Sequence, residues 1–192
     1  MQEGAFGLSA GLSYSHARFA KTEEIVRLAK IAAQYGGIFT VALRDESKGM
    51  LESVREAVKI CRQAGVSTEI TQFKAKGKEN WGLFDEALRE IEKAAEEKLN
   101  INFDLYPYST TGTVLYTYLP EWVSRGGRSK MLERLKNPNI RPKVIEEMKA
   151  DTHNYKNIVV AMSSNLAYVG KRLDQIGVEE NIGPEEAVIN TL

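Results

Sequence analysis

Side chains that can bind ligands or exchange protons gather directly after the segments whose composition predicts β-strands. In proteins that alternate strands and helices, ligands bind at the carboxyl ends of the parallel strands. We therefore expect any site of this chain to be built from the residues at those ends. In chain order they are Arg44, Asp45 and Glu46, then Gln72 and Lys74, then Asp104 and Tyr106, and finally Ser163, Ser164 and Asn165.

The chain offers few residues that bind transition metals. It contains one cysteine, Cys61, and two histidines, His16 and His153. The histidines have no i,i+4 relation and no cysteine nearby in sequence, so we interpret both as ordinary loop residues. Cys61 falls at helical spacing with Val54 and Val58, which favours a small buried side chain over the alternative of a reactive thiol.

Short apolar or β-rich runs alternate with amphipathic segments of helical period, and this alternation predicts βαβ crossovers and a parallel sheet. We expect Thr22, ahead of two glutamates, to cap the first helix. The final helix is expected to begin at Pro184. Five runs predict strands: Phe6–Leu12, Ile38–Ala42, Ser67–Gln72, Ile101–Leu105 and Asn157–Met162.

The predicted fold class is α/β, a partial TIM-type (β/α) barrel of about five parallel strands that forms one domain over residues 1–192. An open, doubly wound sheet is the alternative. The turn after the first strand reads GLSAGLSYSHA and lacks the GxGxxG fingerprint of dinucleotide-binding folds. Five strands are fewer than the eight that close a barrel, so the barrel would be incomplete.

Composition excludes several classes of function. The 26 Lys and Arg residues balance the 26 Asp and Glu residues, so no electrostatic surface for nucleic acid or anionic membrane is expected. No apolar run approaches the length of about 18 residues that a membrane span needs. The start of the chain lacks a basic stretch followed by an apolar core, and we expect a cytoplasmic protein without a signal peptide.

Several motifs in their order resemble the N-acyl-D-amino-acid deacylase (D-aminoacylase) family of the amidohydrolase superfamily. They are EGAFGLSAGLSY, KTEEIVRLAKIAAQYGGIF, LRDES, ITQFKAKGKENWG, DLYPYSTTGT and LPEW. The resemblance covers nearly the whole chain but only a middle part of a longer family chain. It implies a metal-dependent (β/α)8 barrel that hydrolyses linear amides with zinc.

The chain departs from the family at the residues that hold zinc. The family shows Thr-His-x-Arg and Ser-His-x-Lys at two strand ends, where this chain has Val41-Ala42-Leu43-Arg44 and Thr71-Gln72-Phe73-Lys74. The family's other ligands and its catalytic aspartate would lie outside residues 1–192. Catalytic zinc needs about three protein ligands to activate water. We therefore expect no catalytic residue, no metal ligands and no cofactor in this chain.

Unlike the zinc-binding positions, some of the family's substrate-binding positions have matching residues in this chain. The resemblance places Lys74 at the lysine that contacts the substrate carboxylate, and Tyr106 and Tyr14 at or near pocket tyrosines. Arg44 keeps its motif position, but we favour a structural role for it, in which it holds the strand end together through Asp45, Glu46 or Asp104. The family expects a serine after YPY where this chain has Gly112. For all four candidate binding residues, we favour the interpretation that they are structural remnants, and substrate binding is the alternative.

Three hypotheses of function follow. The first is a truncated, catalytically silent relative of the zinc-dependent deacylases. The second is one part of an enzyme assembled from more than one chain, since open sheet edges favour association, including a homo-oligomer. The third is a non-enzymatic binding or scaffold module for an acylated amino acid or peptide, with Lys74 and Tyr106 as anchors.

Overall fold

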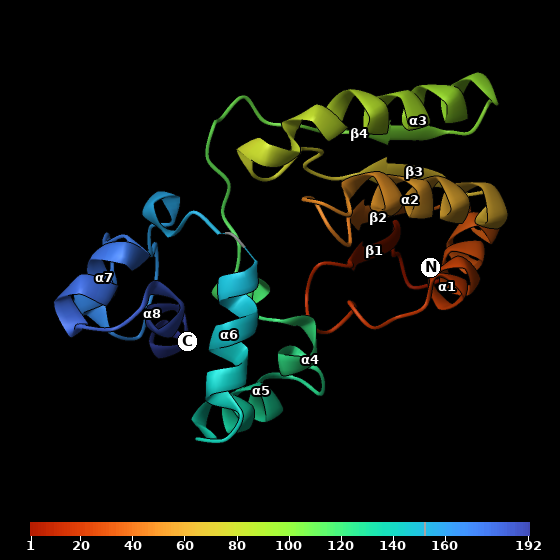
Figure 1. The fold of residues 1–192 in the computed structure, drawn as a ribbon. Coiled ribbons are helices and arrows are strands. Elements are labelled where there is room, and N and C mark those ends of the chain that lie inside the picture. The colour runs from red at the N-terminus through yellow and green to blue at the C-terminus, as the bar shows by residue number, and fades with distance from the viewer. Residues whose placement is uncertain (152) are drawn as a thin grey trace. The chain divides into compact units, whose positions relative to one another are not determined.

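The protein is described by a computed structural model that covers residues 1–151 and 153–192 (Figure 1). The chain divides into two compact units, Met1–Thr110 and Thr111–Leu192. Each unit has its own hydrophobic core. All strands of the described sheet lie in the first unit, and the second unit is helical. The expectation of one domain over residues 1–192 stays a prediction.

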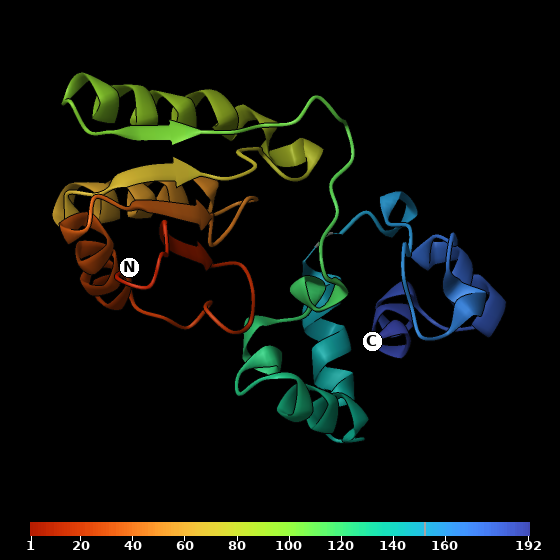
Figure 2. The ribbon, with the colours of Figure 1, turned by 180° about the vertical axis from the view of Figure 1, so that it is seen from behind.

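The first unit is built on a parallel sheet of four strands in sequence order. Its strands run in the same direction, as the view from behind also shows (Figure 2). This confirms the predicted α/β class with strands and helices in alternation. The strands are β1 (Gly7–Gly11), β2 (Ile38–Ala42), β3 (Ser67–Ile70) and β4 (Ile101–Phe103).

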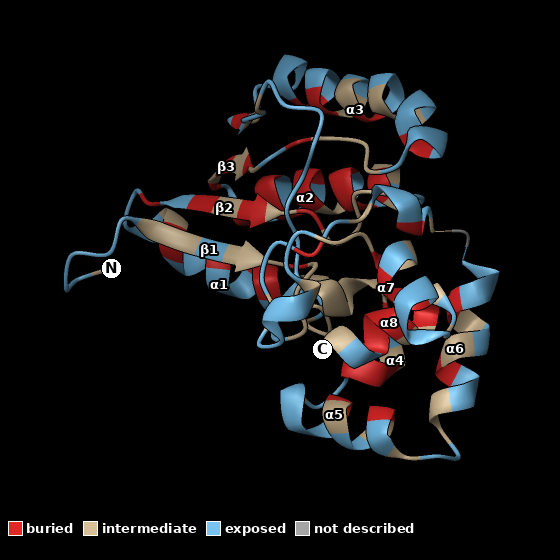
Figure 3. Ribbon diagram, turned by 90° about the vertical axis from the view of Figure 1, so that its left-hand side faces the viewer, coloured by how far each residue is buried: buried red, intermediate tan, exposed pale blue. Residues whose placement is uncertain are grey.

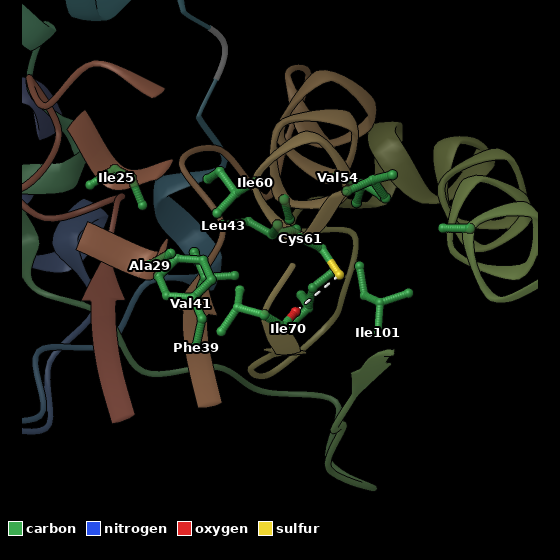
Figure 4. Close-up of a cluster of buried hydrophobic side chains, with 14 of the residues drawn as sticks. Ile25, Ala29, Phe39, Val41, Leu43, Val54, Ile60, Cys61, Ile70 and Ile101 are labelled. Carbon is green, nitrogen blue, oxygen red and sulfur yellow. Dashed lines mark hydrogen bonds between the residues drawn. The ribbon is translucent and has the colours of Figure 1, made fainter. Parts of the chain in front are cut away.

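Three helices follow the first three strands and pack against one face of the sheet. They are α1 (Thr22–Gln34), α2 (Met50–Ala64) and α3 (Phe84–Glu96), the last preceded by the 3-10 helix η1 (Lys78–Leu83). Buried residues run along α2 (Figure 3). The core joins side chains of the helices to Phe39 and Val41 of β2 and to Ile70 of β3 (Figure 4).

The opposite face of the sheet is polar. The residues Ser9, Thr40, Glu69 and Asn102 are partners in register across all four strands, so they form one row. They alternate with the core residues because successive side chains of a strand point to opposite faces. Parallel sheets are ordinarily covered on both faces.

The predicted fifth strand is wrong. Residues 157–162 do not join the sheet but pair with the segment that follows them. Val160 donates to the carbonyl of Lys171 at 2.9 Å, and Leu173 donates to the carbonyl of Ile158 at 3.0 Å. An isolated antiparallel bridge joins Val159 to Arg172. The run is β-rich, but its backbone donors and acceptors are taken up within the second unit.

The second unit confirms that the final helix begins at Pro184, as the sequence predicts. Pro184 stands at the first position of the last helix, where its missing N–H costs nothing. No helix in the described parts of the chain is long and apolar enough to cross a membrane. The helices are α4 (Glu121–Ser124), α5 (Arg128–Lys136), α6 (Arg141–Ala150), α7 (Leu173–Glu180) and α8 (Pro184–Thr191), with 3-10 turns η2 (Leu115–Tyr118), η3 (Tyr155–Asn157) and η4 (Leu166–Tyr168).

Cys61 lies inside the core of the first unit, as its helical spacing predicts (Figure 4). It is 2% exposed, and its Sγ lies 3.3 Å from the carbonyl oxygen of Val66. Burial raises the pKa of the thiol, against smaller opposing effects of Thr68 and Arg62. We expect no modification of the folded chain by a thiol reagent at pH 7 and complete modification in denaturant, measured by mass spectrometry. Rapid labelling of the folded chain would contradict this placement.

Candidate functional site

The carboxyl ends of β2, β3 and β4 bring together three of the residues that the sequence analysis singled out. Nζ of Lys74 donates to Oε1 of Glu46 at 2.6 Å and to the carbonyl of Gln72 at 3.0 Å. The same ammonium lies 5.8 Å from the ring centroid of Tyr106, within cation–π range. The side chains of Lys74 and Glu46 are only 18% and 19% exposed. The sequence named Lys74 and Tyr106, and Glu46 is the partner it did not assign.

Tyr106 combines an aromatic wall with a buried polar atom. Its ring lies 6.2 Å from that of Tyr108. Its hydroxyl is buried without a hydrogen-bond partner among the described residues. A buried hydroxyl without a partner costs free energy unless a ligand or water satisfies it. This atom is therefore a candidate for hydrogen bonding to a bound molecule.

Arg44 is fixed by contacts of its own unit. Its Nε donates to Oε2 of Glu56 at 2.9 Å and its Nη2 to Oε1 at 2.8 Å, a bidentate pair between the end of β2 and α2. The guanidinium also donates to the carbonyl oxygens of Arg18 and, at 3.1 Å, Ala20. These contacts hold the loop between β1 and α1. A substrate contact for Arg44 stays a prediction, and the geometry favours the structural alternative.

Glu56 explains why Thr22 does not cap its helix. The residue at the N-cap position is Lys21, and no side chain caps this end. Thr22 is the first helical residue, and its hydroxyl donates to Oε1 of Glu56 at 2.7 Å. The predicted cap is wrong because the carboxylate of Glu56, distant in sequence, takes up the hydroxyl. Sequence spacing alone carries no signal for this contact.

The Glu56 carboxyl gives the first unit an acid-sensitive contact. Burial raises its pKa, but the hydrogen bonds from Arg44 and Thr22 and the charges of Arg44 and Lys59 outweigh burial, so its pKa lies below the ordinary 4.5. The stabilisation is thus present above pH 4.5 and is lost as the pH falls through the folded-state pKa. We expect the free energy of unfolding to fall between pH 5 and pH 3, measured with urea. In Glu56→Gln this part of the pH dependence should vanish.

The other two carboxylates at the strand ends are engaged by backbone groups. Asp45 accepts from the N–H of Ser47 at 2.7 Å and of Gly49 at 3.1 Å. Asp104 accepts from the N–H of Gln72 at 2.6 Å. Gln72 itself has φ of 56°, the left-handed conformation that side chains other than glycine rarely adopt. Such backbone conformations concentrate at ligand sites.

Tyr14 lies in the loop after β1. Its ring packs against Gly11, where a Cβ would stand 2.6 Å from Cδ2 of Tyr14. It also stacks with the ring of His16 at 6.1 Å between centroids. These contacts fix the loop at the first strand end. A substrate contact for Tyr14 stays a prediction.

Two residues at the strand ends lack a good zinc-binding group. Ala42 at the end of β2 has no donor atom, and Gln72 after β3 offers only a neutral amide. Within residues 1–151 and 153–192, no three His, Cys, Asp or Glu side chains are grouped so that they could hold a metal ion. His153 contacts Tyr118, Tyr155 and Asp151 of the second unit.

Comparison with curated proteins finds deacylases, and no protein-family model matches the chain. A D-aminoacylase of Alcaligenes xylosoxydans xylosoxydans is 35% identical over 115 residues, which are 60% of this chain and 24% of that protein. An N-acyl-D-glutamate deacylase of the same organism is 30% identical over 115 residues, again 60% and 24% of the two chains. An N-acyl-D-aspartate deacylase, also from that organism, is 33% identical over 116 residues, 60% and 23%. The chain spans about a quarter of the length of the curated relatives it matches.

Solved structures give the same likeness in fold. The N-acyl-D-glutamate deacylase of Bordetella bronchiseptica, complexed with zinc and a phosphonate inhibitor, superposes with a TM-score of 0.75 at 24% identity, over 98% of this chain and 33% of that one. A D-aminoacylase structure gives 0.70 at 22% identity, over 99% and 33%. In sequence and in fold, the chain is similar to one part of the length of the D-aminoacylases.

Proposed function

We propose that residues 1–192 are a catalytically silent segment of a deacylase-type barrel, with a degenerate metal site. The observation that carries this proposal is the pair Ala42 and Gln72 at neighbouring strand ends. Family resemblance places metal-binding histidines at both positions. Neither an alanine methyl group nor a neutral amide replaces an imidazole as a zinc ligand.

The loss matters because of what the metal does in such hydrolases. Zinc lowers the pKa of bound water from 15.7 to about 7, which supplies hydroxide for attack on an amide carbonyl. The residues of this chain that remain at the strand ends, Lys74 and Tyr106, bind and orient a ligand but activate no water in this way. The relatives' hydrolysis of N-acyl-D-amino acids is therefore not proposed for this chain alone.

The proposal is tested by assaying release of D-amino acids from N-acetyl-D-glutamate, N-acetyl-D-aspartate and N-acetyl-D-leucine with zinc added. We expect rates equal to a zinc-only blank, whereas enzymes accelerate reactions by at least about 10⁶-fold. A D-aminoacylase relative under the same conditions is the positive control. A zinc-dependent rate that scales with the concentration of this chain would refute catalytic silence.

A second function, binding without hydrolysis, is favoured by the arrangement around Lys74. A largely buried ammonium group beside the ring of Tyr106 suits the carboxylate and the apolar part of an N-acyl amino acid. The buried hydroxyl of Tyr106 adds a hydrogen-bonding group. A peptide with a free carboxyl end presents the same chemistry.

Assembly with further strands is the third proposal. A second copy or another chain would pair with the outer edges of β1 and β4 or pack on the polar face of the sheet. Even so, Ala42 and Gln72 would stand in the completed site. A cytoplasmic location and the lack of nucleic-acid or membrane partners stay expectations from the sequence.

A further inference from the structure

Glu46 holds the position that an external carboxylate would need. Its Oε1 lies 2.6 Å from Nζ of Lys74, and both side chains are largely buried. We propose that Glu46 is a built-in competitor, so that a carboxylate ligand reaches Lys74 only by displacing the Glu46 side chain. This inference rests on the proposed binding function of Lys74 and adds how that binding is controlled.

The neighbouring carboxylates do not take this role, because backbone N–H groups engage them. Asp45 holds the N–H groups of Ser47 and Gly49 in its own loop. Asp104 holds the N–H of Gln72. Glu46 is thus the carboxylate that neutralises Lys74. A strong, short ion pair with little exposure to water is screened less than a surface pair.

Glu46 is anchored through its backbone, while its side chain is the part that must move. Its carbonyl accepts from the N–H of Lys76 at 2.6 Å, which fixes the main chain beside β3. Burial lowers the pKa of the Lys76 side chain, the charge of Lys74 lowers it as well, and Glu46 and Asp45 oppose both effects. Rotating the Glu46 side chain away from Lys74 therefore frees the ammonium group of Lys74 for an incoming carboxylate.

The contact itself is tested by carbodiimide coupling, which activates a carboxyl group and joins it to an amine in direct contact with loss of water. We expect an amide cross-link between Glu46 and Lys74, identified by mass spectrometry after proteolysis. A ligand such as N-acetyl-D-glutamate also carries carboxyl groups that react with the carbodiimide. Competition between a ligand and Glu46 for Lys74 is therefore measured in a separate binding experiment. The exposed pair Lys130 and Glu133, whose Nζ and Oε2 lie 2.8 Å apart, is the reactive reference. Absence of the Glu46–Lys74 cross-link under conditions that couple this pair would overturn the proposal.

Competition is tested by calorimetric titration of N-acetyl-D-leucine into the unaltered chain and into Glu46→Gln, which keeps the side chain's size. A ligand carboxylate must break the charged hydrogen bond between Lys74 and Glu46 in the unaltered chain, and Glu46→Gln weakens that bond. We therefore expect about tenfold tighter binding by Glu46→Gln. Glu97→Gln removes an equal charge from the exposed pair with Arg62 and should leave affinity unchanged. Adding Lys74→Ala to the unaltered chain or to Glu46→Gln should abolish binding. N-acetyl-D-leucine amide, which lacks the carboxylate, should bind to neither the unaltered chain nor Glu46→Gln.

The outcomes separate this inference from the function on which it rests. Equal affinities of the unaltered chain and Glu46→Gln would overturn the competition and leave the binding function standing. A cross-link without binding by either chain would overturn the binding function and the competition together, and leave only a structural ion pair.

Discussion

Phe39→Ala is expected to lower the free energy of unfolding of the first unit by about 3–5 kcal/mol, the usual cost of truncating a buried aromatic side chain. Phe39, the second residue of β2, is fully buried and packs among residues from β2, β3 and the covering helices. Its removal leaves a cavity that a close-packed core fills only in part. Urea unfolding followed by circular dichroism measures the change.

The neighbouring residue on the same strand supplies the control. Ile38 is 47% exposed and points to the opposite face of the sheet, so Ile38→Ala should cost less than about 1 kcal/mol. A cost for Ile38→Ala as large as that for Phe39→Ala would contradict the open face of the sheet. It would show instead that further strands or a second copy cover that face in solution.

Arg44→Met is the substitution with the second largest expected effect. It leaves the Glu56 carboxylate, 13% exposed, without its bidentate partner, and it releases the carbonyls of Arg18 and Ala20. Breaking a buried pair by removing one partner is strongly destabilising, and we expect a loss of about 3 kcal/mol. The measurement is again urea unfolding at pH 7.

Two further variants give the Arg44 prediction its controls. Arg55→Met removes an exposed arginine of the same helix from its ion pairs with Glu52 and, on α3, with Glu90, and should cost less than about 1 kcal/mol. Arg44→Met combined with Glu56→Leu should recover part of the loss, because no buried charge then stands alone. A loss for Arg44→Met no greater than that for Arg55→Met would mean that Arg44 is free for another role, such as ligand binding.

Periodicity of apolar residues predicted most of the fold. The four strands of the sheet and the helices between them stand where the pattern placed them, since each strand buries one face against helices. The prediction of a sheet strand at 157–162 was wrong, because composition indicates burial but not which segment the backbone will hydrogen-bond to. Thr22 failed as a cap for a related reason, since its hydroxyl found the carboxylate of Glu56.

The site was predictable in position but not in contacts. Strand ends and the resemblance together pointed to Lys74 and Tyr106, which the structure brings within 5.8 Å. Nothing in the spacing of Glu46 assigns it to Lys74, because the two follow different strands and meet only through the parallel register of β2 and β3. The strained backbone of Gln72 is likewise visible only in three dimensions.

The most direct test of the account is elemental analysis for zinc on the purified chain, after exposure to excess zinc chloride and thorough desalting. Because Ala42 and Gln72 stand where imidazoles would be needed, we predict far less than one zinc ion per chain. One retained zinc ion per chain, unchanged in a His16→Ala, His153→Ala double variant, would contradict the account and show that the strand ends still bind a metal.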